Sequence, residues 1–317
     1  MGYYILRRLL ASIPVVILVG VMTFSILHIA PGDPAVLMAG EEATPADVEA
    51  MRVALGFDKP FIVQFGKWSG RLLRGDLGTS IFSQHTIVSL MKPRIEPTLS
   101  LAIIAISLSI IIGVPMGVLA AWNQGSFVDR GVMVFAVLGF SIPVFWLGFL
   151  FIWAFAVKIH LFPAVGFVSI TDGVFPFLRS ITLPALANAI PYSALVARMT
   201  RSTMVEVMQE DYIRTARAKG LTERVVNVRH GLRNAAIPIV TVVGLVFAGL
   251  VGGAVVTETV FAIPGLGRLL VDGVVRRDYP IVQAMLMVVA VSYVFVNLAV
   301  DITYAFLDPR IRYSYCS

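Results

Sequence analysis

The chain has 317 residues, of which 58% are hydrophobic and only 14% are charged, and its mean hydropathy is +0.86. Soluble domains are about half apolar and about a quarter charged, so this composition excludes an ordinary soluble domain and indicates a membrane protein. The formal net charge of +6 comes from residues beside hydrophobic stretches, which indicates membrane topology rather than nucleic-acid binding.

The first hydrophobic stretch runs from Leu9 to Ala30, follows Arg7 and Arg8, and contains no charged residue. A helix needs about 20 residues to cross a bilayer, so this stretch is long enough. A secretory signal peptide is the alternative, but its apolar core has only about 7–15 residues and ends at a small-x-small cleavage site, which is not evident here. We therefore predict that residues 1–30 hold a retained first span, with the N-terminus in the cytoplasm.

Residues 31–97 are polar and mixed in composition, with Glu41, Glu42 and Asp47 near the start. Phe61, Phe65 and Trp68 follow at helical spacing. A long loose loop is the alternative, but the aromatic stripe favours short amphipathic helices that fold back on the spans. We predict a small external helical subdomain.

Five more predicted spans follow, which makes six transmembrane helices in an all-α membrane protein. The third of these five is short and contains Pro184, Asn188 and Pro191, so it is the weakest. The spans are residues 98–121, 131–157, 180–197, 235–257 and 280–300, with a cytoplasmic loop at 198–234 and a cytoplasmic tail after the last span.

Two pairs of glycines within the predicted spans are spaced four residues apart, Gly113 with Gly117 and Gly249 with Gly253. This spacing places both members of a pair on one helix face, where the absence of side chains lets a neighbouring helix approach closely. We predict close helix contacts at both pairs.

Lys and Arg residues in short loops favour the cytoplasmic side of a membrane. With the N-terminus inside, most of these residues fall in cytoplasmic segments. The cytoplasmic set is Arg7, Arg8, Arg130, Arg198, Arg201, Arg214, Arg217, Lys219, Arg224, Arg229, Arg233, Arg310 and Arg312, and the outer set is Lys158, Arg179, Arg268, Arg276 and Arg277. Both termini are therefore predicted to be cytoplasmic.

Polar side chains inside predicted spans are candidates for function, because their burial in lipid is costly. Structural packing is the alternative for each one taken singly. The candidates for the transport pathway are Asn188, Ser193, Gln283, Asn297 and Asp301, and Glu258 lies at the outer end of the fifth span.

The segment from Glu210 to Pro238 is the one long basic stretch between two apolar runs. Its pattern predicts two short helices broken at Gly220, with Thr222 as the N-cap of the second. The predicted apolar stripe of the second helix is Leu221, Val225, Val228 and Leu232. A loop whose charge only sets topology is the alternative to a surface that binds a partner.

Motifs of several enzyme classes are absent from the sequence. It contains no G-x-x-x-x-G-K-[ST] phosphate loop, no H-E-x-x-H and no G-x-S-x-G. The four histidines are scattered, and the single Cys316 excludes an internal disulfide and a thiolate metal cluster. We predict that this chain is not an enzyme, does not hydrolyse ATP, and binds no metal or cofactor itself.

Short motifs along nearly the whole chain resemble those of permease subunits of ABC importers, in the form seen in dipeptide, oligopeptide, glutathione and nickel permeases. The longest match is Asp211-Tyr212-Ile213-Arg214-Thr215-Ala216-Arg217-Ala218-Lys219-Gly220, followed by His230-Gly231-Leu232-Arg233-Asn234-Ala235 and Pro238. In the wider superfamily this motif opens Glu-Ala-Ala, and Arg214-Thr215-Ala216 stands there instead. The other matches are Pro31–Pro34, Gly75–Ser80, Glu258–Phe261, Pro264–Gly267, Arg277–Pro280 and Leu307–Arg310.

The resemblance implies a type I ABC importer permease fold and a heteromeric assembly. Its expected partners are a second homologous permease chain, two ATP-binding subunits that carry the ATP and Mg²⁺, an external solute-binding protein and membrane lipid. It also implies a coupling contact with the ATP-binding subunits and an outer mouth that meets the binding protein. The implied coupling residues are Asp211, Tyr212, Arg214, Thr215, Ala216, Arg217, Ala218, Lys219, Gly220 and His230, and the implied outer residues are Glu258, Pro264, Gly265, Gly267, Arg277 and Asp278.

The implied function is that of one half of the translocation pathway of an ATP-driven peptide importer in the inner membrane. The stretch Leu266–Asp272 resembles glutathione or dipeptide permeases most. Nickel and sugar-oligomer uptake share the same architecture and stay open as alternatives. A transporter driven by an ion gradient is the alternative from another class, although no convincing internal repeat supports it.

Overall fold

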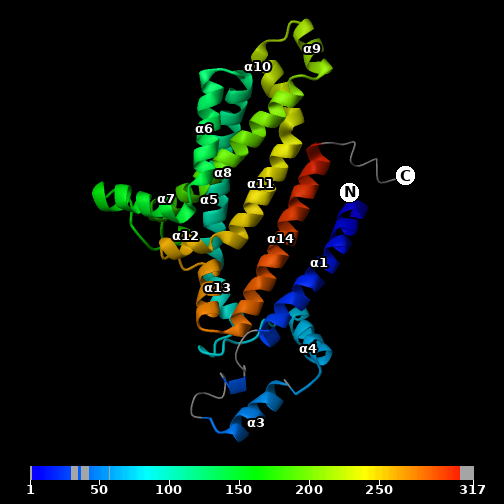
Figure 1. Ribbon diagram of the computed structural model, residues 1–317, viewed down its shortest axis with the longest axis vertical. Coiled ribbons are helices and arrows are strands. Elements are labelled where there is room, and N and C mark those ends of the chain that lie inside the picture. Colours follow the sequence, from blue (N-terminus) through cyan, green and yellow to red (C-terminus); the bar gives the residue numbers. More distant parts are fainter. Residues whose placement is uncertain (1, 30–34, 37–42, 57, 308–317) are drawn as a thin grey trace. The chain divides into compact units, whose positions relative to one another are not determined.

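The computed structural model describes residues 2–29, 35–36, 43–56 and 58–307, and these residues are almost entirely helical (Figure 1). The motif Pro31–Pro34 and the predicted tail from Asp308 lie outside the described residues. The helices are α1 (Gly2–Ile29), α3 (Pro45–Leu55), α4 (Phe61–Leu73), α5 (Ile87–Trp122), α6 (Phe127–Ser141), α7 (Val144–Phe151), α8 (Val174–Val207), α9 (Asp211–Ala218), α10 (Glu223–Val225), α11 (Arg233–Gly253), α12 (Val255–Val260), α13 (Leu266–Val275) and α14 (Tyr279–Leu307). Two π-helical turns, η1 (Ile152–Lys158) and η3 (Val226–Leu232), and a 3-10 turn, η2 (Ile170–Asp172), complete the set.

Five helical stretches are long and apolar enough to cross a membrane: Ile5–Ile26, Ile87–Trp122, Val174–Val207, Glu223–Val251 and Tyr279–Tyr304. The pair α6 and α7–η1 adds a sixth span if the bent pair is counted as one. Within the described residues the structure therefore agrees with an all-α membrane protein of five to six spans.

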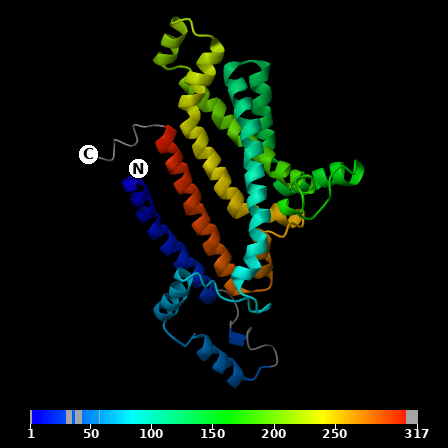
Figure 2. The same cartoon turned by 180° about the vertical axis from the view of Figure 1, so that it is seen from behind.

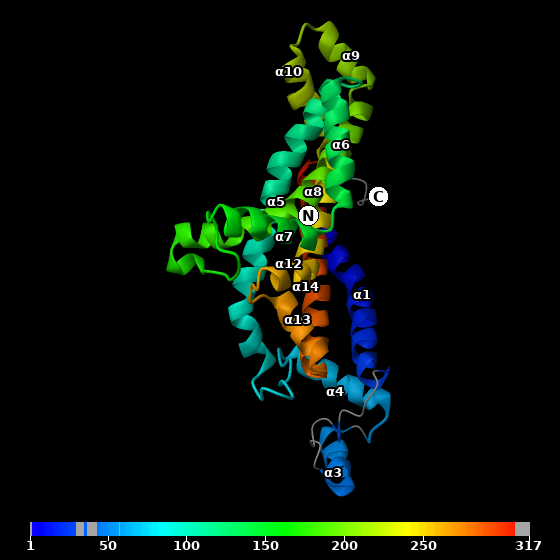
Figure 3. The same cartoon turned by 60° about the vertical axis from the view of Figure 1, so that its left-hand side comes forward.

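The predicted span over residues 131–157 is not one straight helix but two helical pieces with a sharp bend between them. Helix α6 ends at Ser141, and the following helix starts at Val144 after a bend of 97° (Figure 3). Pro143 explains the break, because a proline disfavours helical geometry in the residue before it and cannot donate a backbone hydrogen bond. Ile142 accordingly has an extended backbone, with φ −82° and ψ 125°.

Two other helices extend beyond the predicted limits. Helix α5 begins at Ile87, eleven residues before the predicted start at residue 98, and contains Pro93 and Pro97. Helix α8 covers 34 residues around the predicted span 180–197, and its prolines Pro184 and Pro191 lie inside the helix. Both helices stay continuous at prolines that by themselves predict a break, because neighbouring helices in a membrane bundle can stabilise such positions.

The fifth predicted span, 235–257, is displaced toward the N-terminus. The apolar stretch runs from Glu223 to Val251 through α10, η3 and α11, and a separate helix, α12, follows from Val255. The part of the predicted basic segment after Gly220 is therefore continuous with the span that follows it.

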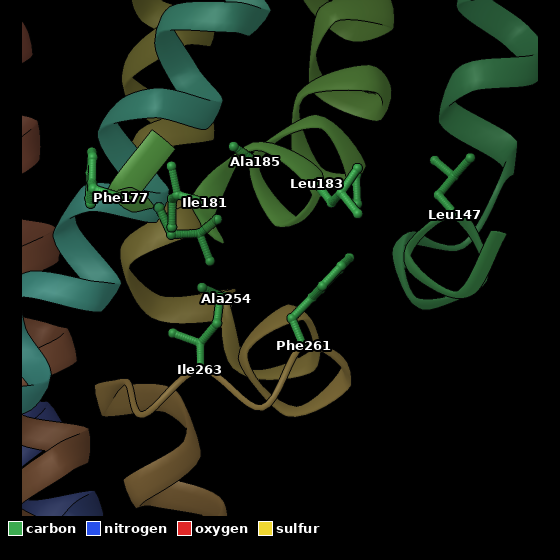
Figure 4. Packing of buried hydrophobic residues seen from close by; sticks show 10 residues of the cluster. Leu147, Phe177, Ile181, Leu183, Ala185, Ala254, Phe261 and Ile263 are labelled. Carbon is green, nitrogen blue, oxygen red and sulfur yellow. The ribbon is translucent and has the colours of Figure 1, made fainter. Parts of the chain in front are cut away.

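The chain divides into two compact units. The first consists of residues 1–7, 96–268 and 292–317, and the second of residues 8–95 and 269–291. The core of the first unit gathers apolar side chains of α5, α7, α8 and α12, with Ile181, Leu183, Phe261 and Ile263 almost fully buried (Figure 4). Helix α8 is the centre of this unit, since it packs against α6, α7, α11 and α12.

Glycines on α5 allow α8 to approach closely, as the spacing of Gly113 and Gly117 predicts. A β-carbon on Gly113 would lie 2.7 Å from the Ser193 carbonyl oxygen. A β-carbon on Gly117 would lie 2.5 Å from Thr200 Cβ and 2.6 Å from the Ala197 carbonyl oxygen. At Gly249 the same atom would have Tyr192 Oη at 3.9 Å as its neighbour, so the prediction of close contact is confirmed for α5 and wrong at Gly249.

The second unit packs the segment that follows α1 against that helix. Phe24 of α1 is buried and lies within 5.3–5.6 Å, between ring centroids, of Phe61, Phe65 and Trp68 of α4. The ring of His28 lies 5.2 Å from that of Phe61. The aromatic stripe of α4 therefore packs on α1, as the sequence predicts.

Replacing Gly117 by Ala is expected to lower the stability of the purified chain by about 1–3 kcal/mol, because the added carbon would overlap atoms of α8. Thermal unfolding in detergent measures this change as a lower Tm. Gly131→Ala is the matched control, since a β-carbon there has no neighbour within 4 Å and Ala favours a helix over Gly by about 0.5–1 kcal/mol. Equal Tm shifts in the two variants would contradict the close contact.

Candidate functional site

The basic segment folds as a hairpin between α8 and α11, which we call the basic hairpin (residues 208–232; Figure 2). Helix α9 ends at Ala218 with Lys219 as its C-cap, and Gly220 follows with φ +78°. The Gly220 amide donates to the Arg217 carbonyl at 2.9 Å, and the Leu221 amide to the Ala216 carbonyl at 3.4 Å. This pair of bonds is a Schellman motif, which needs a left-handed residue that glycine adopts without strain. The predicted break at Gly220 is confirmed.

The basic hairpin has a small apolar core of its own. Ile213 and Val226 are fully buried, Ala216 is nearly so, and Met208 packs against them. The turn η3 lies against the end of α8, because a β-carbon on Gly231 would meet the sulfur and methyl groups of Met208 and Met204 at 3.0–3.2 Å. The hairpin is therefore packed on the end of α8.

The predicted apolar stripe on the second half of the hairpin is wrong for three of its four residues. Leu221, Val225 and Val228 are exposed, whereas Leu232 is partly buried and packs against apolar side chains. The buried residues of η3 are Val226, Asn227 and Gly231. The π-helical turn η3 has a wider repeat than an α-helix, so it changes which residues share a face. Thr222 occupies the N-cap position as predicted, but its side chain makes no cap hydrogen bond.

An ion pair closes the hairpin from the outside. Arg217 Nε donates to Glu223 Oε1 at 2.9 Å, and Nη2 donates to Oε2 at 3.4 Å. The two side chains are 41% and 48% exposed, so the pair contributes about 0.2–1 kcal/mol. Arg217 thus holds the hairpin closed in addition to presenting charge.

The predicted coupling residues form most of the outward face of the hairpin. Ala216 is buried and His230 is half-buried. The exposed ones are Asp211, Tyr212, Arg214, Thr215, Arg217, Ala218, Lys219 and Gly220. Partial burial and the neighbouring charge of Glu210 raise the pKa of the Tyr212 phenol, so Tyr212 stays a neutral hydrogen-bonding group near neutral pH.

A second arrangement connects Glu258 of α12 to the start of α13. The carboxylate accepts hydrogen bonds from Thr98 Oγ1 at 2.6 Å and from the Arg268 amide at 2.8 Å. Thr98 Oγ1 also accepts a bond from the Leu266 amide at 2.8 Å. These bonds satisfy amides of the first turn of α13, which lack partners within the helix.

Glycine leaves the space that this carboxylate occupies. A β-carbon on Gly265 would lie within 2.5 Å of all three atoms of the Glu258 carboxyl group, and one on Gly267 would lie 3.0 Å from Oε2. Burial raises the pKa of Glu258, and the bonds from Thr98, Arg268 and Gly267 oppose that shift. The turn Pro264–Gly267 and Glu258 therefore form one structural unit.

The other predicted outer residues differ in exposure. Pro264 and Arg277 are exposed, whereas Glu258 and Asp278 are buried. Asp278 accepts a bond from Ser80 Oγ at 2.5 Å, which joins the motif Gly75–Ser80 to the motif Arg277–Pro280. The buried residues hold these loops in shape, and the exposed ones lie at the surface.

The predicted pathway residues differ in their surroundings. Asn188 exchanges hydrogen bonds with Thr257 Oγ1 at 3.0 and 3.2 Å, and Ser193 donates to the Ile190 carbonyl. Gln283 and Asp301 are buried, and Asn297 is half-buried. Among the described residues no group of three or more His, Cys, Asp or Glu side chains could hold a metal ion.

Sequence reasoning missed Thr98, Thr257 and Ser80, and it missed the ion pair between Asp129 and Arg201. The sequence Ser126-Phe127-Val128-Asp129 has the spacing of a helix N-terminus, and this signal could have identified Asp129. The partners of Thr98 and Ser80 lie 160 and 198 residues away, and no local pattern predicts such pairs.

Long apolar helices packed side by side, with a folded basic hairpin joining two of them, define a polytopic helical membrane protein with a structured surface outside its spans. The family described as "Binding-protein-dependent transport system inner membrane component" matches residues 113–313, and the N-terminal part of the same group matches residues 1–102. The chain belongs to this family of transport-system membrane components.

Relatives are similar over nearly their whole length. The chain is 46% identical over 313 residues to "Probable peptide ABC transporter permease protein y4tP" of Sinorhizobium fredii, covering 99% of this chain and 100% of that one. It is 41% identical to "Dipeptide transport system permease protein DppB" of Alkalihalophilus pseudofirmus, covering 98% and 99%. It is 43% identical to "Glutathione transport system permease protein GsiC" of Pectobacterium atrosepticum, with the same coverage. The predicted resemblance to ABC permeases is confirmed.

A solved structure shares the fold. A chain of the MetNI methionine ABC transporter in an inward-facing conformation matches with a TM-score of 0.58 and 19% identity, covering 70% of this chain and 97% of that one. At this identity the match is evidence for the fold alone, and it confirms the predicted type I importer permease fold.

Glu258 gives a prediction of pH-dependent stability. The pKa of Glu258 is higher in the folded chain than in the unfolded chain, so protonation of Glu258 stabilises the native protein. This stabilisation is fully present below the unfolded-state pKa and is lost as the pH rises through the folded-state pKa. Glu258→Gln removes this titration. The Tm of the native chain relative to this variant is expected to fall as the pH is raised above about 4.5, the ordinary pKa of a glutamate. Glu206→Gln, at an exposed position of α8, is the control, and a pH-independent difference for Glu258→Gln would contradict the assignment.

Breaking the Arg217–Glu223 pair by Glu223→Arg is expected to speed hydrogen exchange of the α9 amides several-fold while changing global stability by about 1 kcal/mol or less. The reason is that the pair closes the hairpin but is half exposed. Mass spectrometry of exchange measures both effects. The double variant Arg217→Glu/Glu223→Arg should restore protection, and Arg214→Gln, which removes the more exposed Arg214–Asp211 pair, is the control. Unchanged exchange in Glu223→Arg would refute the role.

Proposed function

We propose that this chain is the permease subunit of an ATP-driven importer of short peptides and that it forms one half of the translocation pathway. The relatives named for peptide, dipeptide and glutathione transport support this substrate class. A nickel or sugar-oligomer importer stays the alternative within the same architecture. Family membership favours this mechanism over a transporter driven by an ion gradient.

The observation that carries the proposal is the basic hairpin. It is a folded element between two long helices, with its own core, a left-handed glycine turn and an exposed face that contains Arg214, Thr215 and Lys219. A loop that only set topology would not need such a fold. We assign this face to contact with an ATP-binding subunit, with α9 in a groove of that partner.

The proposed assembly contains a second homologous permease chain, two ATP-binding subunits that hold ATP and Mg²⁺, and an external solute-binding protein. This chain supplies no catalytic residue. ATP must bind one conformation of the assembly better than the other, because only such a difference can shift the conformational equilibrium. Since the hairpin continues into α11 and packs on α8, a displacement of α9 would reach both helices.

The proposed orientation follows from the distribution of Lys and Arg, which places both termini and the basic hairpin in the cytoplasm. The turn Pro264–Gly267 and Arg277 then face the binding protein. We propose that Pro264 and Arg277 make that contact, and that Glu258, Gly265, Gly267 and Asp278 hold the loops in shape. Asn188, Ser193, Gln283, Asn297 and Asp301 remain the proposed polar groups of the pathway.

Gly220→Pro tests the proposed coupling. Proline cannot adopt φ +78° and removes the amide that bonds the Arg217 carbonyl, so it should unfold the turn of the hairpin. In the complex purified from native membranes into nanodiscs, two activities are expected to fall at least about tenfold: the ATPase activity stimulated by the binding protein, and peptide uptake.

Gly56→Pro is the matched control, because Gly56 also ends a helix with a positive φ, +74°, but lies in the external segment. It should leave co-purification of the ATP-binding subunits unchanged. A native chain that purifies without ATP-binding subunits and transports peptide without ATP would refute the proposal. Mass spectrometry of molecules bound to the binding protein would identify the cargo and separate peptides from nickel and sugar oligomers.

A further inference from the structure

Asp129 and Arg201 form a two-pronged ion pair between α6 and α8. Arg201 Nε and Nη2 donate to Asp129 Oδ1 and Oδ2, and the second distance is 2.7 Å. The Asp129 side chain is 5% exposed and that of Arg201 is 25% exposed. Bidentate Arg–carboxylate pairs fix the orientation of both groups as well as their separation, so this pair holds α6 and α8 in one relative position.

The same carboxylate closes the turn between α5 and α6. Asp129 Oδ2 accepts a bond from the Gly125 amide at 2.9 Å, and the Asp129 amide donates to Ser126 Oγ. The Arg201 side chain therefore binds a residue in the first turn of α6 whose carboxylate also holds the α5–α6 turn. One guanidinium connects three helices: α5 and α6 through their turn, and α8 directly.

The surroundings make the pair difficult to break. Ala120, Val132 and Ala197 form a buried apolar cluster from the same three helices. On α8, Thr200 and Ala197 meet Gly117 of α5, and Ala194 lies 3.0 Å from the position of a β-carbon on Gly139 of α6. Removing one partner of a shielded pair leaves a charge without compensation, which is strongly unfavourable.

The pair is also close to the basic hairpin. Arg201 lies six residues before the end of α8 at Val207, a distance of about 9 Å along a helix. The hairpin packs on the same end of α8 through Gly231, Met204 and Met208. A firm connection thus runs from the hairpin to α8, and from α8 through Arg201 to the α5–α6 turn.

We propose that the Asp129–Arg201 pair is a positioning pair that makes α5, α6 and α8 move with the basic hairpin as one rigid body during transport. This role rests on the proposed function, because it concerns how a displacement of the hairpin reaches the spans. Without the pair, the hairpin and α8 would move while the α5–α6 turn lagged behind. ATP would then be hydrolysed with less transport.

The first test compares uptake per ATP hydrolysed in the reconstituted complex. Arg201→Gln and Asp129→Asn are each expected to keep basal ATPase activity within about twofold and to reduce uptake per ATP by at least about tenfold. The exchanged pair Asp129→Arg/Arg201→Asp should recover part of the ratio. Arg201→Lys keeps the charge without the planar fork, so it should give an intermediate ratio.

Arg198→Gln is the matched control, because Arg198 is an exposed arginine one turn earlier on the same helix. It should leave the ratio unchanged. An unchanged ratio in Arg201→Gln would overturn the proposal. The proposal would also be overturned if Arg201→Gln lost assembly of the complex and uptake to the same extent and Arg201→Lys fully restored both. The pair would then have a role only in folding.

The second test measures the rigid body directly and needs no transport. Spin labels are attached at Phe127 on α6 and Val228 on the hairpin, both exposed, in a chain with Cys316→Ser. Pulsed electron resonance should give one narrow distance in the native chain, unchanged on addition of ATP to the complex, and a broad distribution in Arg201→Gln. A native distance that changes with ATP overturns the proposal.

The two tests separate this inference from the proposed function. If the native chain purifies without ATP-binding subunits, the proposed function fails, whereas the label distances in the isolated chain still report on the pair. If the complex transports peptide normally and Arg201→Gln keeps both its narrow distance and its uptake per ATP, only this inference fails.

Discussion

The close approach of α5 to α8 is the contact on which the first unit depends. At Gly113 and Gly117 no side chain of α5 separates it from α8, and the backbone carbonyl oxygens of Ser193 and Ala197 lie 2.7 and 2.6 Å from where a β-carbon would be. Within a bilayer, apolar burial does not drive helices together, so van der Waals contact between closely spaced backbones has to supply the attraction. Because α8 also packs against α6, α7, α11 and α12, its position fixes the others.

Polar bonds are then concentrated at the ends of these helices, where they hold the loops. Asp129 binds Arg201 beside the α5–α6 turn, and Glu258 binds the first turn of α13 together with Thr98. A buried charge is stable only when it is paired or accepts several hydrogen bonds, so each carboxylate strongly favours one arrangement of its loop. The α5–α6 turn and the loop before α13 are consequently each held in one arrangement.

This division of roles suits a subunit that transmits movement made by its partners. The basic hairpin has a core of only a few side chains, but it is continuous with α11 and packed on α8. The bend at Pro143 gives α6 and α7 separate directions, so α6 can move with α8 without carrying a long continuous helix. The chain needs no catalytic group for this task, and its chemistry is that of positioning.

The sequence by itself determined the class of protein, the family, the existence of the spans and the break at Gly220. Composition, charge placement and left-handed glycine turns are local properties, and local properties can be read along a chain. The limits of α5 and α8 were not predictable, because Pro93, Pro97, Pro184 and Pro191 indicate breaks that packing overrides. The bend before Pro143 shows that another proline of the same kind does break a span.

Only the tertiary structure decided that Val226 rather than Val225 is buried, because a π-helical turn changes the register. It alone decided that Glu258 meets Thr98 and that Asp129 meets Arg201, since partners 160 and 72 residues apart are brought together by packing and not by spacing in the sequence.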